Sequence, residues 1–356
     1  MKLGHVARHT QPCAMHRLVE RLLRGRSSNL AAKRCGVRAA RDRGLRAAIF
    51  ASAVLALGMS LSAPCAPARG AALPPVARGV YVIPGTGGDV APQNGGRVAN
   101  AVAIVGPRGV IVVDSGVSFR DGEAIIAATR RLSRRPIRLL ILTHVAPEVV
   151  FGAAAFQVRG IPVLMHHDAA ALMAARCDAC LARLTDALGE RAMVGTRVVV
   201  PDRLVAATTN LDLIGRRLRL IVPGRGSTPG ALAVLDPQTG TLVAGDLVPV
   251  ARVPDTRDTD GEDWRDALSV LGATRCAHLV PTFGRVADCQ ALDAIDAYFA
   301  TLDACARRAF AEGVGLAAVP ARCALPQFAG WDGYATLHAG NASRAFLRVE
   351  RASFGK

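Results

Sequence analysis

The stretch from Leu140 to Phe156, LILTHVAPEVVFGAAAF, holds the side chains most able to do chemistry in this sequence. It has the outline of a metal-binding turn: an apolar strand, a Thr-His pair, a short polar turn, a glycine and a helix of small residues. The imidazole of His144 and the carboxylate of Glu148 are of the types that bind transition metals. Ala146 and Val149, in the same turn, have no atom to donate. The stretch therefore predicts a metal-site scaffold whose ligands are incomplete.

Other carboxylates and histidines could add to this turn. Asp246 follows the hairpin sequence DPQTGTLVAG and adds a carboxylate after a strand. Asp114, in VVDSG, also follows a strand, and an aspartate there commonly forms a turn. His278 opens an apolar strand, and we interpret it as structural. His338 lies near the carboxyl end and has no partner at metal-ligand spacing.

The composition excludes some classes of function. The 356 residues are 51% hydrophobic, 20% charged and 4% aromatic, with a formal charge of +16. Residues 1–50 hold 12 of the Lys/Arg and 2 of the Asp/Glu, whereas residues 73–356 hold 31 and 26. The body of the chain thus has an ordinary surface charge, and it lacks the basic groove with interleaved aromatics that nucleic-acid binding requires. We therefore expect no nucleic-acid partner.

The excess positive charge precedes an apolar run from Ala47 to Leu61, which small residues follow. This order is typical of a secretory signal, and the run is short for a membrane span. We interpret residues 1–72 as an N-terminal extension with a cleaved signal, which implies a periplasmic or secreted protein without a stable membrane anchor. A membrane anchor and lipid attachment at Cys65 are alternatives, but Pro64 argues against the latter. One interpretation places the start of translation at Leu30 or Val37; a genuine basic extension is the other.

Export changes the interpretation of the cysteines, because disulfides form in oxidising compartments. Six of the nine cysteines follow residue 72: Cys177, Cys180, Cys276, Cys289, Cys305 and Cys323. The first two are three residues apart on a predicted helix, where a structural disulfide or free buried thiols are favoured over a redox or metal role. The last two flank a helix and a glycine-containing turn, and we expect them to lie close enough to bridge.

The hydrophobic pattern predicts two β-rich halves, each followed by helices. Strands are expected at 79–85, 101–106, 110–116, 137–143, 161–167, within 203–224, 231–246 and 276–284; helices at 121–135, 150–160, 168–192, 261–273 and 291–314. Such a succession favours two packed sheets with helices outside. We assign residues 73–290 to the main domain and residues 291–356 to a C-terminal helical lobe.

This arrangement resembles the metallo-β-lactamase fold superfamily, and more narrowly its secreted branch of quinoprotein relay system zinc metallohydrolases. The resemblance runs from about Val80 to Glu350. It rests on these motifs in order: NGGRVAN, VVDSG, VFGAAAF, DPQTGTLVAGDLV, VPTFG and NASRAFLRVE. It implies an α/β fold, a metallo-β-lactamase-like αββα sandwich with a C-terminal helical extension, and a zinc-dependent hydrolase ancestry.

The resemblance also assigns ligand positions. The superfamily's first metal turn is THxHxDH, and this sequence has THVAPEV. The seven ligand positions correspond to His144, Ala146, Glu148, Val149, Ser227, Asp246 and Phe283. Only His144 and Asp246 keep the family's ligands, while Glu148 is a longer carboxylate in place of an aspartate. Since a catalytic zinc needs three protein ligands, we expect zinc to be absent or weakly bound.

The resemblance further implies that Asp114 supports the metal turn from behind and that the pair His166-His167 lies beside the pocket. We expect Val149 and Phe283 to line the former metal cavity and to make it drier. Three functions remain open. The chain is a pseudoenzyme linked to periplasmic quinoprotein systems that binds a small molecule or a periplasmic protein, an active hydrolase with one metal on His144, Glu148 and Asp246, or a decaying gene copy.

The export hypothesis predicts the mature amino terminus. Cleavage is expected after about Ala68 or Ala72, because small residues there follow the basic and apolar regions of a signal. N-terminal sequencing of the exported protein measures this directly. A mature protein that begins upstream of Ala47 would contradict the hypothesis.

Overall fold

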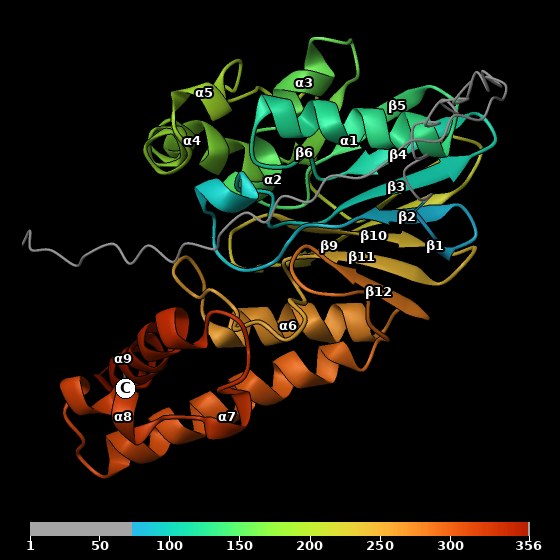
Figure 1. Ribbon diagram of the computed structural model, residues 1–356. Coiled ribbons are helices and arrows are strands. Elements are labelled where there is room, and N and C mark those ends of the chain that lie inside the picture. The colour runs from blue at the N-terminus through green and yellow to red at the C-terminus, as the bar shows by residue number, and fades with distance from the viewer. Residues whose placement is uncertain (1–72, 355–356) are drawn as a thin grey trace, which may run out of the picture. The chain divides into compact units, whose positions relative to one another are not determined.

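The computed structural model describes residues 73–354, so the predicted signal lies outside the described residues. Within them, two β-sheets pack face to face, and helices cover the outer face of each sheet (Figure 1). The expected αββα sandwich with C-terminal helices is therefore confirmed. Its layers follow the chain, because the first sheet and its helices precede the second sheet and its helices.

The first sheet has seven strands in sequence order. The first four strands pair antiparallel, and β4 to β7 pair parallel through helical crossovers. The strands are β1 (Pro75–Ala77), β2 (Val80–Ile83), β3 (Ala101–Gly106), β4 (Gly109–Val113), β5 (Ile137–Ile141), β6 (Val163–His166) and β7 (Arg203–Val205). The helices of this layer are α1 (Phe119–Leu132), α2 (Pro147–Val150), α3 (Ala153–Gln157), α4 (His167–Leu188) and α5 (Glu190–Met193).

The second sheet has five strands in the order β12-β11-β10-β9-β8. Strands β8 to β11 form an antiparallel meander, and β12 returns parallel to β11 after helix α6. The elements are β8 (Thr209–Leu211), β9 (Leu218–Gly224), β10 (Ala231–Asp236), β11 (Thr241–Gly245), α6 (Gly261–Gly272) and β12 (His278–Pro281).

The central strands carry apolar side chains on both faces, so each of them contributes to two hydrophobic cores. Leu139 and Ile141 of β5 face the second sheet, whereas Leu140 and Leu142 face the helices of the first layer. Successive side chains of a strand point to opposite faces, so a strand apolar at every position is buried on both. All four side chains are fully buried. The runs that read as buried strands in the sequence are therefore the central strands.

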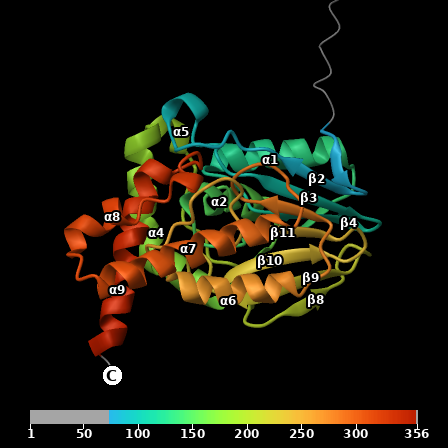
Figure 2. The same ribbon diagram turned by 90° about the horizontal axis from the view of Figure 1, so that it is seen from below.

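The first of the C-terminal helices packs against α6, and the later ones pack on that first helix (Figure 2). They share one apolar cluster with the second sheet, in which the rings of Tyr298, Phe299 and Trp264 meet. The lobe is therefore joined to the sandwich by a common core. Its elements are α7 (Ala291–Ala311), α8 (Val319–Arg322) and α9 (Ala339–Phe354), with a π-helix at Tyr334–His338 between the last two.

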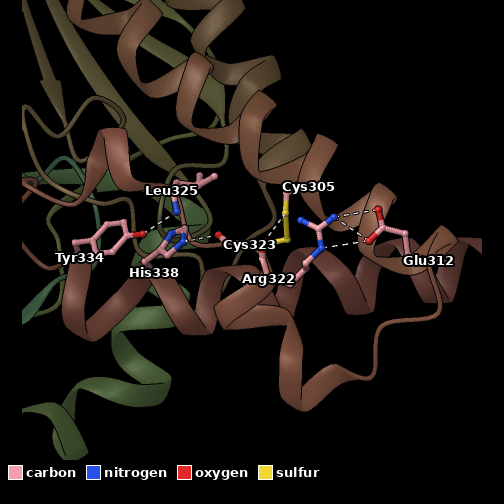
Figure 3. The surroundings of a disulfide bond; sticks show 7 residues. All are labelled: Cys305, Glu312, Arg322, Cys323, Leu325, Tyr334 and His338. Atoms are coloured by element: carbon pink, nitrogen blue, oxygen red, sulfur yellow. Dashed lines mark hydrogen bonds and ion pairs between the residues drawn. A yellow bond between two sulfur atoms is a disulfide. The ribbon is translucent and has the colours of Figure 1, made fainter.

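Two disulfides fasten this part of the chain. Cys305 of α7 and Cys323 after α8 are bonded with a Cα separation of 5.6 Å, as the sequence predicted (Figure 3). His338 Nε2 donates a hydrogen bond to the Cys323 carbonyl, 2.9 Å away. The second bridge joins Cys276 and Cys289, whose Cα atoms lie 6.0 Å apart. Between residues 73 and 354, no helix is long and apolar enough to cross a membrane.

A buried ion pair joins the two sheets. Arg216 Nε lies 2.9 Å from Asp236 Oδ1, and the two side chains are 5% and 1% exposed. The same guanidinium donates to the carbonyls of Arg78 and Val105 in the first sheet, at 2.9 and 3.1 Å. Burial opposes ionisation of Asp236, but hydrogen bonds from Arg216 and Thr239 outweigh it and hold the pKa of that carboxyl below its ordinary value.

The pair gives a stability prediction. Asp236→Asn should lower the free energy of unfolding by about 3–5 kcal/mol at neutral pH, because it leaves Arg216 charged and unpaired in the interior. The difference in free energy of unfolding between wild type and Asp236→Asn should shrink as the pH falls through the lowered pKa of Asp236, because acid then protonates that carboxyl. Denaturant unfolding at several pH values measures both effects.

The double variant Arg216→Met with Asp236→Leu is the matched control. It should regain much of the lost stability, since no buried charge is left unpaired. Equal stability of wild type and Asp236→Asn at neutral pH would contradict the assignment.

Candidate functional site

The predicted site residues meet in one cavity of about 570 Å³. It lies at the carboxyl ends of β5, β11 and β12. His144 follows β5, Asp246 follows β11 and Phe283 follows β12, and all three line the cavity with Glu148 and Ser227. The expectation that His144 and Asp246 face the same cleft is confirmed, since His144 Nδ1 lies 3.8 Å from Asp246 Oδ1.

Asp114 holds the turn that carries His144. Its carboxylate accepts the Thr143 amide at 2.9 Å and the hydroxyls of Thr143 and Thr282 at 3.0 and 3.2 Å. Burial raises the pKa of the Asp114 carboxyl above its ordinary value, against the effects of His144 and of these hydrogen bonds. Asp114 has a left-handed backbone, with φ 62°, which aspartate tolerates better than most residues. These hydrogen bonds tie Asp114 to the turn that carries His144, which is the role that the sequence resemblance implied.

The network selects a tautomer for His144. Thr143 Oγ1 lies 2.8 Å from His144 Nδ1 and 3.0 Å from both Asp114 oxygens. A carboxylate is the stronger acceptor, so the single hydroxyl proton points to Asp114. The hydroxyl oxygen then accepts a proton from Nδ1, and in the neutral ring Nε2 keeps its lone pair. We infer that His144 presents Nε2 as an acceptor.

Asp246 is positioned by a sharp turn and engaged by Ser227. Gly245, directly before it, has a left-handed backbone with φ 61°, and an added Cβ there would lie 3.0 Å from Thr143 Cβ. Ser227 donates its amide to Asp246 Oδ2 at 2.9 Å, and its hydroxyl donates to the same oxygen. Ser227 therefore occupies one oxygen of the Asp246 carboxylate.

Phe283 and Arg252 form another wall. The Arg252 guanidinium lies 4.7 Å from the centre of the Phe283 ring, a cation–π arrangement, and also pairs with Asp332 of the C-terminal lobe. Thr336 and Leu337, from the π-helix of that lobe, line the cavity too. The lobe therefore contributes directly to the site. The sequence analysis missed Arg252, because its partner lies 80 residues away and no local pattern links them.

The donors present do not fit the zinc ion that the resemblance implies. Within residues 73–354, one group of three His, Cys, Asp or Glu side chains brings its ligand atoms within 4.8 Å of one another, and it does not include His144, Glu148 or Asp246. Glu148 lines the cavity but does not complete a set of three with the other two. A catalytic zinc takes three protein ligands plus water. Two neighbouring donors are too few.

That one group is His166, His167 and Asp168, where β6 meets α4. His166 Nδ1 accepts the Asp168 amide at 3.1 Å and so caps the amino end of α4. Its other nitrogen interacts with the Ala206 carbonyl. Both ring nitrogens are therefore occupied, and we assign His166 to a structural role, as the sequence favoured. His338, hydrogen-bonded to Tyr298 at 3.0 Å, is also structural.

The structure places Val149 away from the cavity. Val149 is fully buried in the core between the first sheet and its helices, so the expectation that it lines the cavity was wrong. It lies in the first turn of α2, which turns its side chain inward.

Cys177 and Cys180 are free thiols, and burial together with the neighbouring Cys180 raises the pKa of Cys177 to about 12. So high a pKa disfavours redox chemistry there.

Asp114→Asn tests the network behind His144. Asn keeps the left-handed backbone accessible but offers an amide group toward donors, so the free energy of unfolding should fall by about 1–3 kcal/mol. Nitrogen-15 NMR of wild-type His144 should show the Nδ1-protonated tautomer. Asp212→Asn, in an exposed pair with Arg108, is the control and should have a small effect, below about 0.5 kcal/mol. A wild-type ring protonated at Nε2 would contradict the network.

The chain was compared with known proteins. It is 36% identical over 53 residues to a linear primary-alkylsulfatase of Pseudomonas sp. (strain ATCC 19151), a match that covers 15% of this chain and 10% of that protein. Its fold is similar to a metallo-beta-lactamase from Pontibacter korlensis, with 21% identity, 57% of this chain and 87% of that chain covered, and a TM-score of 0.49.

Two more solved structures are similar. A metallo-beta-lactamase from Hirschia baltica is 17% identical and covers 63% of this chain and 95% of its own, with a TM-score of 0.48. One from Pseudomonas aeruginosa, in its mono-zinc form, is 18% identical and covers 63% and 92%, with a TM-score of 0.49. Residues 94–278 match the sequence model of the metallo-beta-lactamase superfamily. Because that match spans just over half of the chain, the protein belongs to the metallo-beta-lactamase superfamily.

Proposed function

We propose that this protein is an exported, non-hydrolytic member of its superfamily that binds a small molecule in the cavity around His144 and Asp246. In this proposal it serves periplasmic quinoprotein systems as a pseudoenzyme. The observation that carries the proposal is the bonding of Asp246. Its Oδ2 accepts both the amide and the hydroxyl of Ser227, which stands where a hydrolase of this family has a metal ligand.

The other wall of the cavity supports the same proposal. Phe283, at another ligand position, has Arg252 against its ring. A guanidinium repels a metal cation, and a phenyl ring offers it no ligand atom. Both groups can contact an organic molecule. The volume of about 570 Å³ is in the range of small-molecule sites.

Export is supported by the cysteines. Two disulfides, Cys276–Cys289 and Cys305–Cys323, join residues of the described chain, and such bonds persist in oxidising compartments. The quinoprotein link rests on the sequence resemblance alone. The alkylsulfatase match covers a tenth of that enzyme and gives no substrate for this chain. The competing proposal, a hydrolase with one metal on His144, Glu148 and Asp246, is a distinct outcome of the following test.

The test is the zinc content and hydrolytic activity of the mature protein. After exposure to zinc and gel filtration, elemental analysis should find substoichiometric zinc, because two neighbouring donors hold it weakly. The variant Ala146→His, Ser227→His and Phe283→His should take up about one zinc per chain, since added imidazoles complete a tetrahedral set with His144 and Asp246. Val149 is left unchanged because it packs in the core.

A matched control adds His144→Ala to that variant, and its zinc uptake should fall again. Ester and lactam substrates are assayed with each protein, with and without a chelator. Stoichiometric zinc together with chelator-sensitive hydrolysis by the unaltered protein would refute the pseudoenzyme proposal and establish the hydrolase.

A further inference from the structure

The cavity lining contains two buried polar atoms that have no hydrogen-bond partner. Only three buried side-chain atoms lack a hydrogen-bond partner within residues 73–354, and two of them are His144 Nε2 and Asp246 Oδ1. The two residues are 1% and 6% exposed, and both line the cavity. Leaving a buried acceptor without a donor is costly, so each of these atoms calls for a partner. These two lack donors, which a ligand would have to supply.

The charges of the cavity lining favour a positive ligand. Three of its four arginines are already paired: Arg176 with Asp258, Arg257 with Asp255, and Arg252 with Asp332. Among the described residues Arg183 has no ion-pair partner, and it is exposed. The carboxylates left without an arginine are Asp89, Glu148 and Asp246. Three negative charges therefore face one free guanidinium.

We propose that the cavity binds the ammonium group of a small primary amine, with Asp246 Oδ1 and His144 Nε2 as its acceptors. An ammonium group carries three donors and needs only acceptors within reach, whereas zinc needs a third neighbouring protein ligand that is missing here. The hydrocarbon part of the amine contacts the apolar wall made by Val145, Phe283 and Leu337. This inference rests on the proposed function, since it names the ligand class of the same cavity.

Gly226 lies next to the unpaired oxygen of Asp246. A Cβ built at this residue would lie 3.0 Å from Asp246 Oδ1, closer than an ordinary contact. The backbone of Gly226 is not left-handed, so alanine is compatible with its conformation. Gly226→Ala therefore crowds the unpaired oxygen without changing any charge.

The experiment measures binding to metal-free mature protein in a buffer with chelator. The probes are primary alkylammonium ions from methyl to hexyl, each tested beside the alcohol of the same chain length. We expect at least one ammonium ion to bind about tenfold more tightly than its alcohol, because a hydrogen bond to a charged group contributes about 1.5–3 kcal/mol. Calorimetry gives the affinities, and the nitrogen-15 shift of His144 Nε2 should move on binding.

Variants tie the effect to the two atoms. Asp246→Asn and Gly226→Ala should each lower ammonium affinity about tenfold or more. Asp212→Asn is the matched control, because it makes the same change at an exposed carboxylate that is paired with Arg108 and does not line the cavity, and it should leave the affinity within about twofold. Circular dichroism and thermal unfolding confirm that each variant folds.

Three results would overturn the inference: no ammonium ion preferred over its alcohol, undiminished binding by Asp246→Asn, or no binding by any member of the series. None of them affects the proposed pseudoenzyme function, which depends on zinc content and hydrolysis. Conversely, a zinc-loaded, chelator-sensitive hydrolase would refute the proposed function whatever the amine affinity of the metal-free protein.

Discussion

The structure of the site depends on one buried carboxylate, that of Asp114. It accepts hydrogen bonds from Thr143, just after β5 of the first sheet, and from Thr282, just after the edge strand β12 of the second sheet. The ends of two separate sheets are thereby held at a common point. Asn100 adds to this junction by donating to the carbonyls of Pro281 and Gly284, both at 2.9 Å. A misplaced Asp114 would shift His144 and Phe283 together.

Apolar burial stabilises the layers that carry the site. The strands that carry the site are held by burial of Leu139 to Leu142 and of their partners across the sheets, and each large apolar side chain contributes about 1.5–3 kcal/mol. Of the cavity lining, Val145, Ala146 and Cys180 pack against these clusters, and they are only partly buried. Ser227 and Phe283, at two positions where the sequence resemblance places ligands, belong to neither cluster. The strands are thus held by contacts along their length, and the cavity lies at their carboxyl ends.

The fold was readable from the sequence because the hydrophobic period and the turn residues agree along the chain. Strand ends could be placed within a few residues, and the proximity of Cys305 and Cys323 followed from a helix that turns back. Val149 could not be placed correctly, because motif spacing gives a position in a turn and does not tell which way a one-turn helix presents its side chain. The pairing of Arg252 with Asp332 depends on how the lobe docks, which is a tertiary property. Ser227 lines the cavity, and its bonds to Asp246 could not be foreseen from the sequence.

The disulfide between Cys305 and Cys323 has a consequence for where the protein can mature. It closes a loop with a sequence separation of 18 residues, next to the segment that supplies Thr336 and Leu337 to the cavity. In the entropic account, closing a loop of about this length lowers the conformational entropy of the unfolded chain. This stabilises the folded protein by about 3 kcal/mol. In a reducing compartment that restraint is absent. The C-terminal lobe would then pack less stably, and the wall of the cavity that it supplies would be held less firmly. The redox state of Cys305 and Cys323 would then set how firmly that wall is held, more firmly in oxidising than in reducing surroundings.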